Sequence, residues 1–283
     1  RFLGIVHPSL VIFVKYEFWY YYLKKIKYRN IPLILISALF RKDMPFFKWY
    51  GGLQRKILSR FEHLFVQNES SKKLLDEIGW ADITTVSGDT RFDRVIEIAG
   101  AAEPVPGIEK FIDGHKTIIA GSTWSDDEEL LKKASGFLES NGVKLIIAPH
   151  HVNPKHIRTL QALFPGSLLY STISRGSNDN SRILIIDNVG MLSRIYQYAW
   201  CCYVGGGLSR TGVHNVLEAA VYHKPVLFGS NYGKYREAVE LVSAKGAIPV
   251  HGKDQFIDTL SRLMKDPALY RETGEKAGQY VKA

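Results

Sequence analysis

The 283-residue sequence lacks features that mark several classes of protein. It has only two cysteines, Cys201 and Cys202, which are neighbours without metal-ligand spacing around them. We therefore expect two small buried side chains in a reduced compartment. No run of roughly 20 apolar residues is present to span a bilayer. The first residues also lack the basic and apolar regions of a signal peptide. Short-period repeats and low-complexity tracts are absent as well.

The composition predicts a packed protein with two domains. Hydrophobic residues make up 46% of the chain and aromatic residues 12%, which is too apolar for a disordered protein. A chain of this length exceeds most single cores and fits two domains of ordinary size.

Positive charge is confined to one end of the chain. Residues 1–60 hold twelve Lys and Arg side chains, opposed only by Glu17 and Asp43, so this segment carries +10. The remaining 223 residues sum to −1. No RNA- or DNA-binding motif accompanies the basic residues, so we expect an anionic partner other than nucleic acid.

An aromatic stretch lies within this basic segment. The residues concerned are Phe46, Phe47, Lys48 and Trp49, with Arg55 and Lys56 shortly after them. Basic side chains among aromatic rings suit an anionic membrane surface, where ammonium groups meet phosphates and rings lie at the headgroup level. The alternative is a solvated basic helix whose rings face the core.

Short apolar runs alternate with amphipathic stretches, which predicts a parallel α/β architecture. The first strands are expected at 10–14, 32–37, 63–67 and 84–87, and the first helices at 18–29, 45–60 and 69–78. A segment rich in Gly, Ala and Pro then predicts a linker at 100–107. The domains would thus be 1–99 and 108–283. About four strands make a thin half of a sheet, so we expect the first domain to be incomplete.

The second domain is expected to be whole. Its strands are predicted at 117–120, 145–148, 183–186, 202–204 and 225–228, and its helices at 126–138, 154–163, 191–199, 214–222, 235–244, 253–265 and 267–281.

The most informative motif follows a buried strand of this second domain. It reads Tyr-Val-Gly-Gly-Gly-Leu-Ser-Arg-Thr-Gly-Val-His-Asn-Val-Leu-Glu and ends at Glu218. Its glycines, including Gly206 and Gly207, allow close approach and present free amides, and a helix starting near His214 would add its positive end. Asn215 and Glu218 would share one helix face with His214, where a carboxylate can accept hydrogen bonds from two ribose hydroxyls. The motif predicts a nucleotide site.

Two other strand ends of the second domain carry candidate ligand-binding residues. Gly121, Ser122 and Thr123 would present amides and hydroxyls, although the acidic residues after them also suit simple helix capping. Of two neighbouring histidines, His150 is expected to donate to a phosphate or sugar carboxylate. Adjacent side chains diverge and no third ligand is near in sequence, so we expect no metal.

Three further positions complete the candidate set. Asp187, Gly190 and Met191 place backbone groups that suit a base edge, with an Asx turn as the equally good alternative. In the first domain, Glu17 is a candidate for binding or proton transfer. Arg91 is expected near the interdomain cleft, where it could neutralise a phosphate or carboxylate.

The motifs and their order resemble those of bacterial 3-deoxy-D-manno-octulosonic acid (Kdo) transferases, which act on lipid A precursors. The matching segments are Tyr16-Glu-Phe-Trp19, Gly88-Asp-Thr-Arg-Phe-Asp93, Gly121-Ser-Thr-Trp124, Ala148-Pro-His-His151 and Gly205-Gly with His214-Asn-Val-Leu-Glu218. The resemblance covers nearly the whole chain, and the His-Asn-x-Leu-Glu element is its most specific part.

This resemblance implies a GT-B fold, with two Rossmann-like doubly wound domains facing a cleft. It implies an inverting, metal-independent transfer of Kdo from CMP-Kdo to a lipid A precursor in lipopolysaccharide biosynthesis, without a cofactor. The second domain would bind the donor. The first would bind the acceptor lipid at the cytoplasmic face of the inner membrane.

The first domain departs from the family in one respect. The family's usual Glu-Thr-Glu reads Tyr-Glu here, and the family's presumed general base belongs to a segment that would precede residue 1. An inverting transfer needs a base for the acceptor hydroxyl, and Glu17 is the acidic side chain left to consider ahead of Asp43. We therefore expect donor binding without turnover, and expect any anchor to lie in the preceding segment.

Two alternatives remain open at this point. A GT-B enzyme that transfers a sugar from a UDP-sugar to a lipid would share the glycine-rich loop and the ribose carboxylate. A non-catalytic lobe that only binds a nucleotide or an anionic lipid would share them too.

Overall fold

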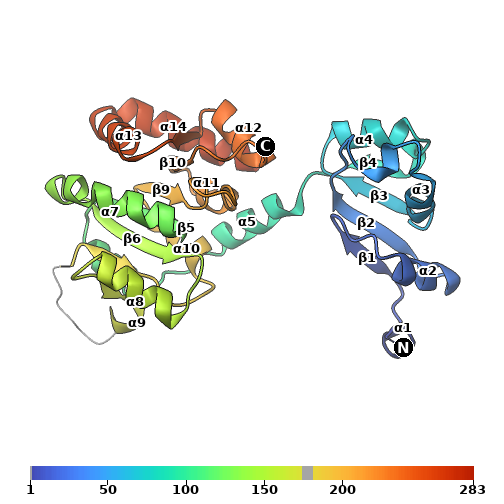
Figure 1. Ribbon diagram of the computed structural model, residues 1–283, viewed down its shortest axis with the longest axis horizontal. Helices are drawn as coiled ribbons and strands as arrows, with labels where there is room; N and C mark the ends of the chain where they lie inside the picture. The colour runs from blue at the N-terminus through green and yellow to red at the C-terminus, as the bar shows by residue number, and fades with distance from the viewer. Residues whose placement is uncertain (1, 174–180) are drawn as a thin grey trace. The chain divides into compact units, whose positions relative to one another are not determined.

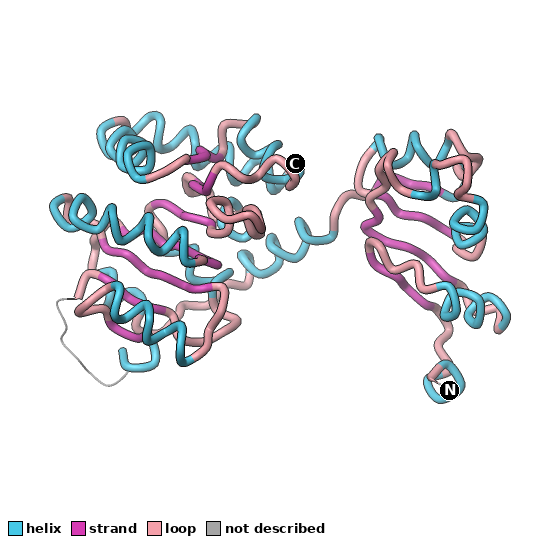
Figure 2. The backbone as a smooth tube through the Cα atoms, in the orientation of Figure 1, coloured by secondary structure: helices cyan, strands magenta, loops and turns pink. Residues whose placement is uncertain are grey.

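The computed structural model describes residues 2–173 and 181–283; Arg1, one of the twelve basic residues, lies outside this part. The chain forms two compact units, Arg1–Arg91 and Phe92–Ala283, which Figures 1 and 2 show as ribbon and tube. We call them the N-terminal unit and the C-terminal unit. No helix within the described ranges combines the length and apolar composition needed to cross a membrane.

The N-terminal unit contains a parallel sheet in the order β1-β2-β3-β4. Its strands are β1 (Val11–Val14), β2 (Leu33–Ala38), β3 (His63–Val66) and β4 (Thr84–Val86). Its helices are α1 (Leu3–Val6), α2 (Tyr20–Tyr28), α3 (Gly52–Leu58) and α4 (Glu69–Asp76), with 3-10 turns η1 (Pro45–Phe47) and η2 (Ala81–Ile83). The predicted strands are confirmed to within one or two residues.

The core of this unit lies on one face of the sheet. Leu23 of α2, Leu58 of α3 and Leu75 of α4 are buried in one cluster with the inward-facing strand residues. On the other face of edge strand β1, Ile12 and Val14 are 49% and 43% exposed. Within the described residues, helices α2 to α4 therefore cover one face, whereas a doubly wound sheet has helices on both.

The helix predicted over 45–60 is divided in two. It consists of η1 and α3, separated by a turn in which Gly51 N–H donates to the carbonyl of Lys48. A side chain at Gly51 would lie 2.0 Å from the carbonyl oxygen of Pro45. The chain therefore bends back on itself at this glycine, and a continuous helix does not form.

The C-terminal unit is built on a larger parallel sheet, in the order β11-β10-β9-β5-β6-β8-β7. Its strands are β5 (Thr117–Thr123), β6 (Lys144–Pro149), β7 (Leu168–Leu169), β8 (Ile183–Ile185), β9 (Cys201–Val204), β10 (Val226–Gly229) and β11 (Ala247–Val250). Its helices are α5 (Thr90–Gly100), which starts at the unit boundary, α6 (Ile108–Ile112), α7 (Ser125–Ser140), α8 (Pro154–Leu163), α9 (Tyr170–Ile173), α10 (Leu192–Ile195), η3 (Tyr196–Tyr198), α11 (Leu217–Ala220), α12 (Arg236–Ser243), α13 (Lys253–Lys265) and α14 (Pro267–Lys282).

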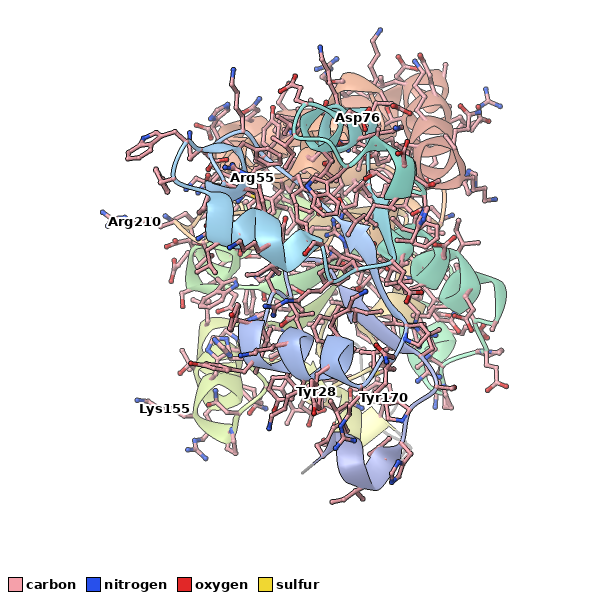
Figure 3. All side chains as sticks on the ribbon, turned by 90° about the vertical axis from the view of Figure 1, so that its right-hand side faces the viewer. Tyr28, Arg55, Asp76, Lys155, Tyr170 and Arg210 are labelled. Carbon is pink, nitrogen blue, oxygen red and sulfur yellow. The ribbon has the colours of Figure 1, made fainter. Side chains whose placement is uncertain are left out.

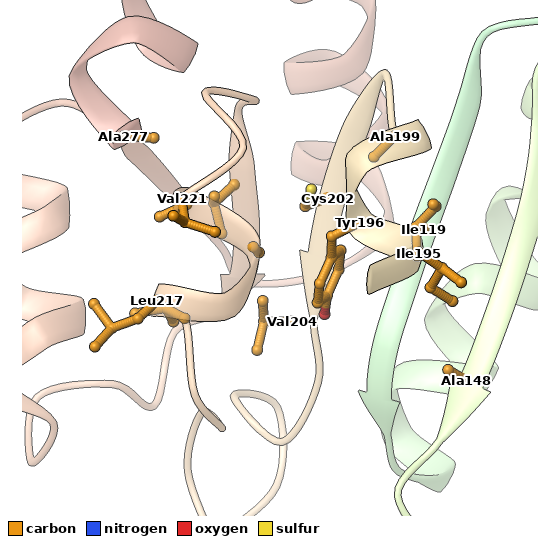
Figure 4. Close-up of a cluster of buried hydrophobic side chains, with 14 of the residues drawn as sticks. Ile119, Ala148, Ile195, Tyr196, Ala199, Cys202, Val204, Leu217, Val221 and Ala277 are labelled. Carbon is orange, nitrogen blue, oxygen red and sulfur yellow. The ribbon is translucent and has the colours of Figure 1, made fainter. Parts of the chain in front are cut away.

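Helices cover both faces of this sheet, as Figure 1 shows. Residues of α7, α8 and α13 form the core on one face, and residues of α6, α11, α12 and α14 form it on the other. Figure 4 shows the second core, where Cys202 and Val204 of β9 lie near Tyr196. Cys201 and Cys202 are both buried and unpaired with each other, which confirms the prediction that they are small buried side chains.

The segment predicted as a linker belongs to the C-terminal unit. Val95 of α5, Val105 and Ile108 are buried in the core of that unit. The main-chain N–H of Val105 also donates to the hydroxyl of Tyr198 at 2.8 Å. The chain therefore divides after Arg91 rather than at 100–107, because apolar residues in and around that segment pack against the larger sheet.

Candidate functional site

The order of the C-terminal sheet brings three loops together. β5 lies between β6 and β9. The chain therefore adds β6 on one side of β5 first, and later returns to add β9 on the other side. Such a switch in strand order leaves a crevice at the carboxyl ends of the strands, where ligands bind in open α/β sheets. The loops after β5, β6 and β9 carry most of the predicted donor-binding residues.

Three aromatic side chains from these loops are in contact. The indole N–H of Trp124 donates to Nε2 of His214 at 2.6 Å. The His150 ring stacks on both, with ring centroids 4.9 Å from Trp124 and 4.4 Å from His214. His151 packs edge-on against Trp124. The structure thus brings the predicted His150 and His214 together, and adds Trp124 as their common partner.

The two central imidazoles have lowered proton affinity. Burial lowers the pKa of His214, and the nearby His150 and His151 lower it further. Burial and His151 likewise lower the pKa of His150. Because their ordinary pKa is 6.5, both rings are neutral at pH 7 and offer one N–H donor each.

The glycine-rich loop differs from the prediction of three free amides. The N–H of Gly205 donates to the carbonyl of Gly121 at 2.9 Å. The N–H of Gly206 donates to the Asp127 carboxylate at 2.8 Å. Among the described residues, only the Gly207 amide of the three has no hydrogen bond. Two of the amides therefore hold the loop in place, and the third is the one left to bind an anion if the prediction holds.

Close packing explains why glycine occupies these positions. A Cβ at Gly207 would lie 2.6 Å from the main chain of Gly229. Gly206 has φ +89°, and a Cβ there would lie 2.3 Å from the carbonyl oxygen of Gly212. The main chain of the loop therefore packs closely against Gly212 and Gly229, which leaves no room for side chains at Gly206 and Gly207.

The helix expected from His214 starts later than predicted. α11 contains only Leu217–Ala220, and the residues before it have long-range main-chain hydrogen bonds. The N–H of Val213 donates to the carbonyl of Asn231, and that of His214 to the carbonyl of Gly205. His214 and Asn215 therefore precede a very short helix, which begins at Leu217 and not near His214 as predicted.

Asp127 joins the glycine loop to the start of α7. Its fully buried carboxylate accepts three hydrogen bonds. The donors are the main-chain N–H of Gly206, the main-chain N–H of Trp124 at 2.9 Å and the Tyr203 hydroxyl at 2.7 Å. Burial raises the pKa of this carboxyl, although the three hydrogen bonds act in the opposite direction. Nothing in the sequence distinguishes Asp127 from an ordinary helix cap, since acidic residues at a helix start are common.

We expect Asp127→Ala to destabilise the protein by about 3 kcal/mol, because three buried donors lose their acceptor. Asp127→Asn should cost less, since an amide oxygen can accept the two N–H groups and the Tyr203 hydroxyl can rotate to accept from the amide. Urea unfolding measures both. Asp126→Ala, at an exposed neighbour on the same helix, is the control. Equal stability of Asp127→Ala and this control would contradict the assigned role.

The residues at the end of β5 have distinct environments. Gly121 is buried against Tyr196, whose hydroxyl would lie 2.1 Å from a Cβ there. The Thr123 hydroxyl donates to the buried Glu128 carboxylate at 3.0 Å. Ser122 lies at a register shift with φ +53°, and its hydroxyl has no hydrogen bond among the described residues. Of the three predicted residues, Ser122 is the one whose hydroxyl is not engaged within the described part of the fold, and its contact with a ligand stays a prediction.

Glu218 lies beside Asn215, as the motif predicts. The Asn215 amide donates to the Glu218 carboxylate at 2.9 Å. Burial raises the pKa of Glu218, and the Asn215 amide partly offsets that shift. Nearby, the buried hydroxyl of Tyr222 has no hydrogen-bond partner among the described residues. Burial, Cys202 and Glu218 raise the pKa of Tyr222 to about 12, so this overlooked hydroxyl is a donor at neutral pH.

The predicted base-reading segment follows β8. Asp187 accepts hydrogen bonds from the main chain and hydroxyl of Ser171, at 3.0 and 2.5 Å. Gly190 is exposed with φ +92°, whereas the side chain of Met191 is buried in the core. The side chains of Asp187 and Met191 are thus engaged within the fold, and contact of this segment with a base stays a prediction.

In the N-terminal unit, Arg91 belongs to a cluster at the carboxyl edge of the sheet. Its Nε and Nη2 atoms both lie 2.8 Å from Oδ2 of the buried Asp89, and Lys15 Nζ lies 3.7 Å from the same oxygen. Burial would raise the pKa of Asp89, but the hydrogen bonds and charges of Arg91, with the charge of Lys15, lower it overall. Arg91 is thus held in position by Asp89, and its contact with a donor stays a prediction.

Glu17 lies in the exposed loop after β1 and accepts a hydrogen bond from the indole of Trp19. Among the described residues, no histidine or second carboxylate is hydrogen-bonded to it. Nothing in this environment marks Glu17 as a proton acceptor for catalysis.

The predicted aromatic membrane surface is divided between core and solvent. Phe46 is only 6% exposed and packs with Phe47 in the core. Phe46 is therefore a core residue, whereas Phe47 is partly buried and its membrane contact stays a prediction. The Arg55 guanidinium donates to the carbonyls of Phe46 and Lys48, at 3.0 Å each, and so stabilises this turn. Figure 3 labels Arg55 on α3.

A smaller surface remains exposed around this turn. Trp49 is 92% exposed, and Tyr50 and Leu53 are each 57% exposed. Lys56 is exposed and Lys48 partly so. We call these five residues the Trp49 surface. It keeps the combination of rings and ammonium groups on which the prediction depended.

Among residues 2–173 and 181–283, no three His, Cys, Asp or Glu side chains lie together in a way that could hold a metal ion. The adjacent His150 and His151 have their rings inclined at 70° to each other.

Comparison with known proteins confirms the resemblance that the motifs indicated. Residues 1–94 match the family described as "3-Deoxy-D-manno-octulosonic-acid transferase (kdotransferase)". A 3-deoxy-D-manno-octulosonic acid transferase of Rickettsia felis is 24% identical over 98% of this chain. The chain spans 61% of the length of that relative.

Solved structures share the fold. The C-terminal CMP-Kdo binding domain of WaaA from Acinetobacter baumannii aligns with a TM-score of 0.55 and 20% identity, covering 68% of this chain and all of that domain. UDP-GlcNAc 2-epimerase from Neisseria meningitidis, bound to UDP-GlcNAc, aligns with a TM-score of 0.66 and 17% identity, covering 99% of this chain and 76% of the epimerase. The predicted GT-B type of α/β fold, with Rossmann-like units, is thereby confirmed.

Proposed function

We propose that the C-terminal unit binds the nucleotide-sugar CMP-Kdo and that the whole protein transfers Kdo from it to a lipid A precursor. The supporting observation is the set of groups at the carboxyl ends of β5, β6 and β9. The Gly207 amide and the His150 and His214 N–H groups can donate to a phosphate, and Glu218 can accept from a ribose. The choice of Kdo as the transferred sugar rests on the resemblance to Kdo transferases over nearly all of the chain.

The chemistry proposed for the whole protein is an inverting transfer. The acceptor hydroxyl attacks the anomeric carbon of Kdo, the bond to the CMP phosphate breaks, and a base takes the hydroxyl proton. The donor groups listed above would stabilise the charge that develops on the leaving phosphate. We assign no base among the described residues, since Glu17 lacks a supporting environment, and we expect this chain to bind donor without turning it over.

A UDP-sugar enzyme is the second candidate function. The observation in its favour is the likeness, over 99% of this chain, to an epimerase bound to UDP-GlcNAc. Saturation-transfer NMR separates the two candidates. With CMP, we expect saturation of the cytosine and ribose protons in the wild-type protein and little in Glu218→Ala. Stronger saturation of UMP than of CMP would favour the UDP-sugar alternative.

We further propose that the Trp49 surface contacts an anionic membrane that holds the acceptor lipid. Trp49→Ala should lower binding to anionic lipid vesicles by about tenfold, because an exposed indole loses its place among the headgroups. Sedimentation with vesicles of increasing phosphatidylglycerol content measures this. Tyr28→Ala, at a ring 89% exposed on α2, is the control and should bind like wild type. If Trp49→Ala bound anionic vesicles as strongly as the wild type, the proposed membrane contact would be contradicted.

A further inference from the structure

The hydrogen bond between Trp124 and His214 has only one possible direction. An indole N–H is a donor and has no acceptor, so Nε2 of His214 accepts through its lone pair. The N–N distance is 2.6 Å. A neutral imidazole carries one proton, and with Nε2 occupied as acceptor that proton is on Nδ1.

The ring geometry fits a strong contact. The planes of Trp124 and His214 are inclined by only 2°, with centroids 6.1 Å apart. At that separation two parallel rings joined by a short N–H···N contact lie edge to edge in one plane, which is where the imidazole lone pair points. His150 covers this pair, inclined at 19° to Trp124 and 18° to His214.

Among the described residues, Nδ1 is the nitrogen of His214 that has no hydrogen bond. Nε2 is used by Trp124, and the main-chain N–H is bonded to Gly205. Among the described residues, no group is hydrogen-bonded to Nδ1. The titratable groups that face this ring are His150 and His151. The Asp127 carboxylate is joined to the neighbouring main chain of Trp124 and Gly206.

We propose that Trp124 is a positioning residue that fixes His214 as the neutral Nδ1–H tautomer, so that Nδ1–H donates to an oxyanion bound at these strand ends. This inference rests on the proposed function only for the identity of that oxyanion, the phosphate of the nucleotide donor. A protonated His214 would direct a second N–H at the indole N–H, so the same contact keeps the ring uncharged. Recognition of the phosphate would then depend on a directed hydrogen bond rather than on a titrating charge.

Long-range 1H–15N NMR of the histidine rings in the wild-type chain tests the tautomer without any ligand, with His214→Gln to assign the signals. We expect His214 in the Nδ1–H form, and expect Trp124→Phe, which keeps a ring but loses the N–H, to shift it toward the Nε2–H form. Trp200→Phe is the matched control, since Trp200 stacks on Tyr270 at the opposite end of β9. A wild-type His214 in the Nε2–H form would overturn the assignment.

Ligand binding tests the second half of the proposal. Trp124→Phe should weaken CMP binding about tenfold, the loss of one hydrogen bond to a charged group. It should leave the affinity for cytidine, which has no phosphate, unchanged. Between pH 6 and 8 the affinity for CMP should change more steeply with pH in the variant than in the wild type, because the phosphate titrates in both but His214 gains a proton only in the variant. Equal losses for CMP and cytidine would mean that Trp124 acts only by shaping the site. If the wild type binds no CMP at all, the proposed function fails, and the tautomer spectra still decide the role of Trp124.

Discussion

Replacing Glu218 by alanine is expected to weaken CMP binding by about 100-fold, the largest loss for any side chain of the donor site. A half-buried carboxylate that accepts from two ribose hydroxyls makes two charge-assisted hydrogen bonds, together about 3 kcal/mol. Asn215 already orients this carboxylate through a 2.9 Å hydrogen bond, so little reorganisation opposes binding. Calorimetric titration of the variant with CMP measures the loss.

The pH dependence of the same titration provides a second test of Glu218. Burial raises the pKa of this carboxyl above its ordinary value of 4.5. The ionised form accepts ribose hydroxyls, so CMP affinity should fall as the pH is lowered through this raised pKa. Glu218→Gln should lose that pH dependence. The control is Glu139→Ala, at an exposed residue near the far end of α7. A Glu218→Ala protein that binds CMP like this control would show that the ribose lies elsewhere.

Gly206→Ala is expected to remove CMP binding and to destabilise the protein by about 3 kcal/mol. The residue has φ +89°, where a side chain is strained. The added methyl group would also lie 2.3 Å from the carbonyl oxygen of Gly212, which is main chain and can move only with the loop. The loop would then lose its hydrogen bond from Gly206 to Asp127. Urea unfolding and CMP titration measure the two effects.

Gly136→Ala is the matched control for this substitution. Gly136 lies within α7, and a Cβ there would meet no atom within 4 Å. Alanine should stabilise the helix by about 0.5–1 kcal/mol, because it restricts the unfolded chain and suits helical backbone. If Gly206→Ala behaved like Gly136→Ala, the loop would be more adaptable than its contacts indicate.

The sequence predicts the elements well where local signals and tertiary packing agree. α8 begins at Pro154 after Asn153, whose side chain accepts from the His156 N–H, and both its ends are as predicted. Prediction fails where long-range contacts hold the main chain outside a regular helix. The amide of His214 bonds to Gly205, and the helix that periodicity places there is reduced to Leu217–Ala220.

The individual residues of the candidate site could be predicted from the sequence, but the hydrogen bonds between them could not. The motifs identify His150, His214 and Glu218, because these residue types follow strands and glycines. They do not reveal that the indole of Trp124 meets His214, since the two residues are 90 positions apart. Nor do they reveal that Asp127 occupies the Gly206 amide, because a helix-capping acid and a loop-binding acid look the same in sequence.

The aromatic stretch illustrates the same limit in the N-terminal unit. Phe46 and Trp49 are three residues apart, and nothing in the local sequence shows which of the two rings is buried. Phe46 packs against Phe18, with ring centroids 4.9 Å apart, whereas Trp49 projects from the turn before α3 and is 92% exposed. The tertiary contacts of Phe46, which the local sequence does not show, decide which ring is in the core.

The most direct test of the central claim is calorimetric titration of this protein with CMP, UMP and UDP under identical conditions. We expect CMP to bind more tightly than either uridine nucleotide, with a 1:1 stoichiometry that is lost in Glu218→Ala. That result would support a Kdo-type donor site in the C-terminal unit. Tighter binding of UMP or UDP would contradict it in favour of a UDP-sugar enzyme, and the absence of binding by all three would contradict a nucleotide site at these strand ends.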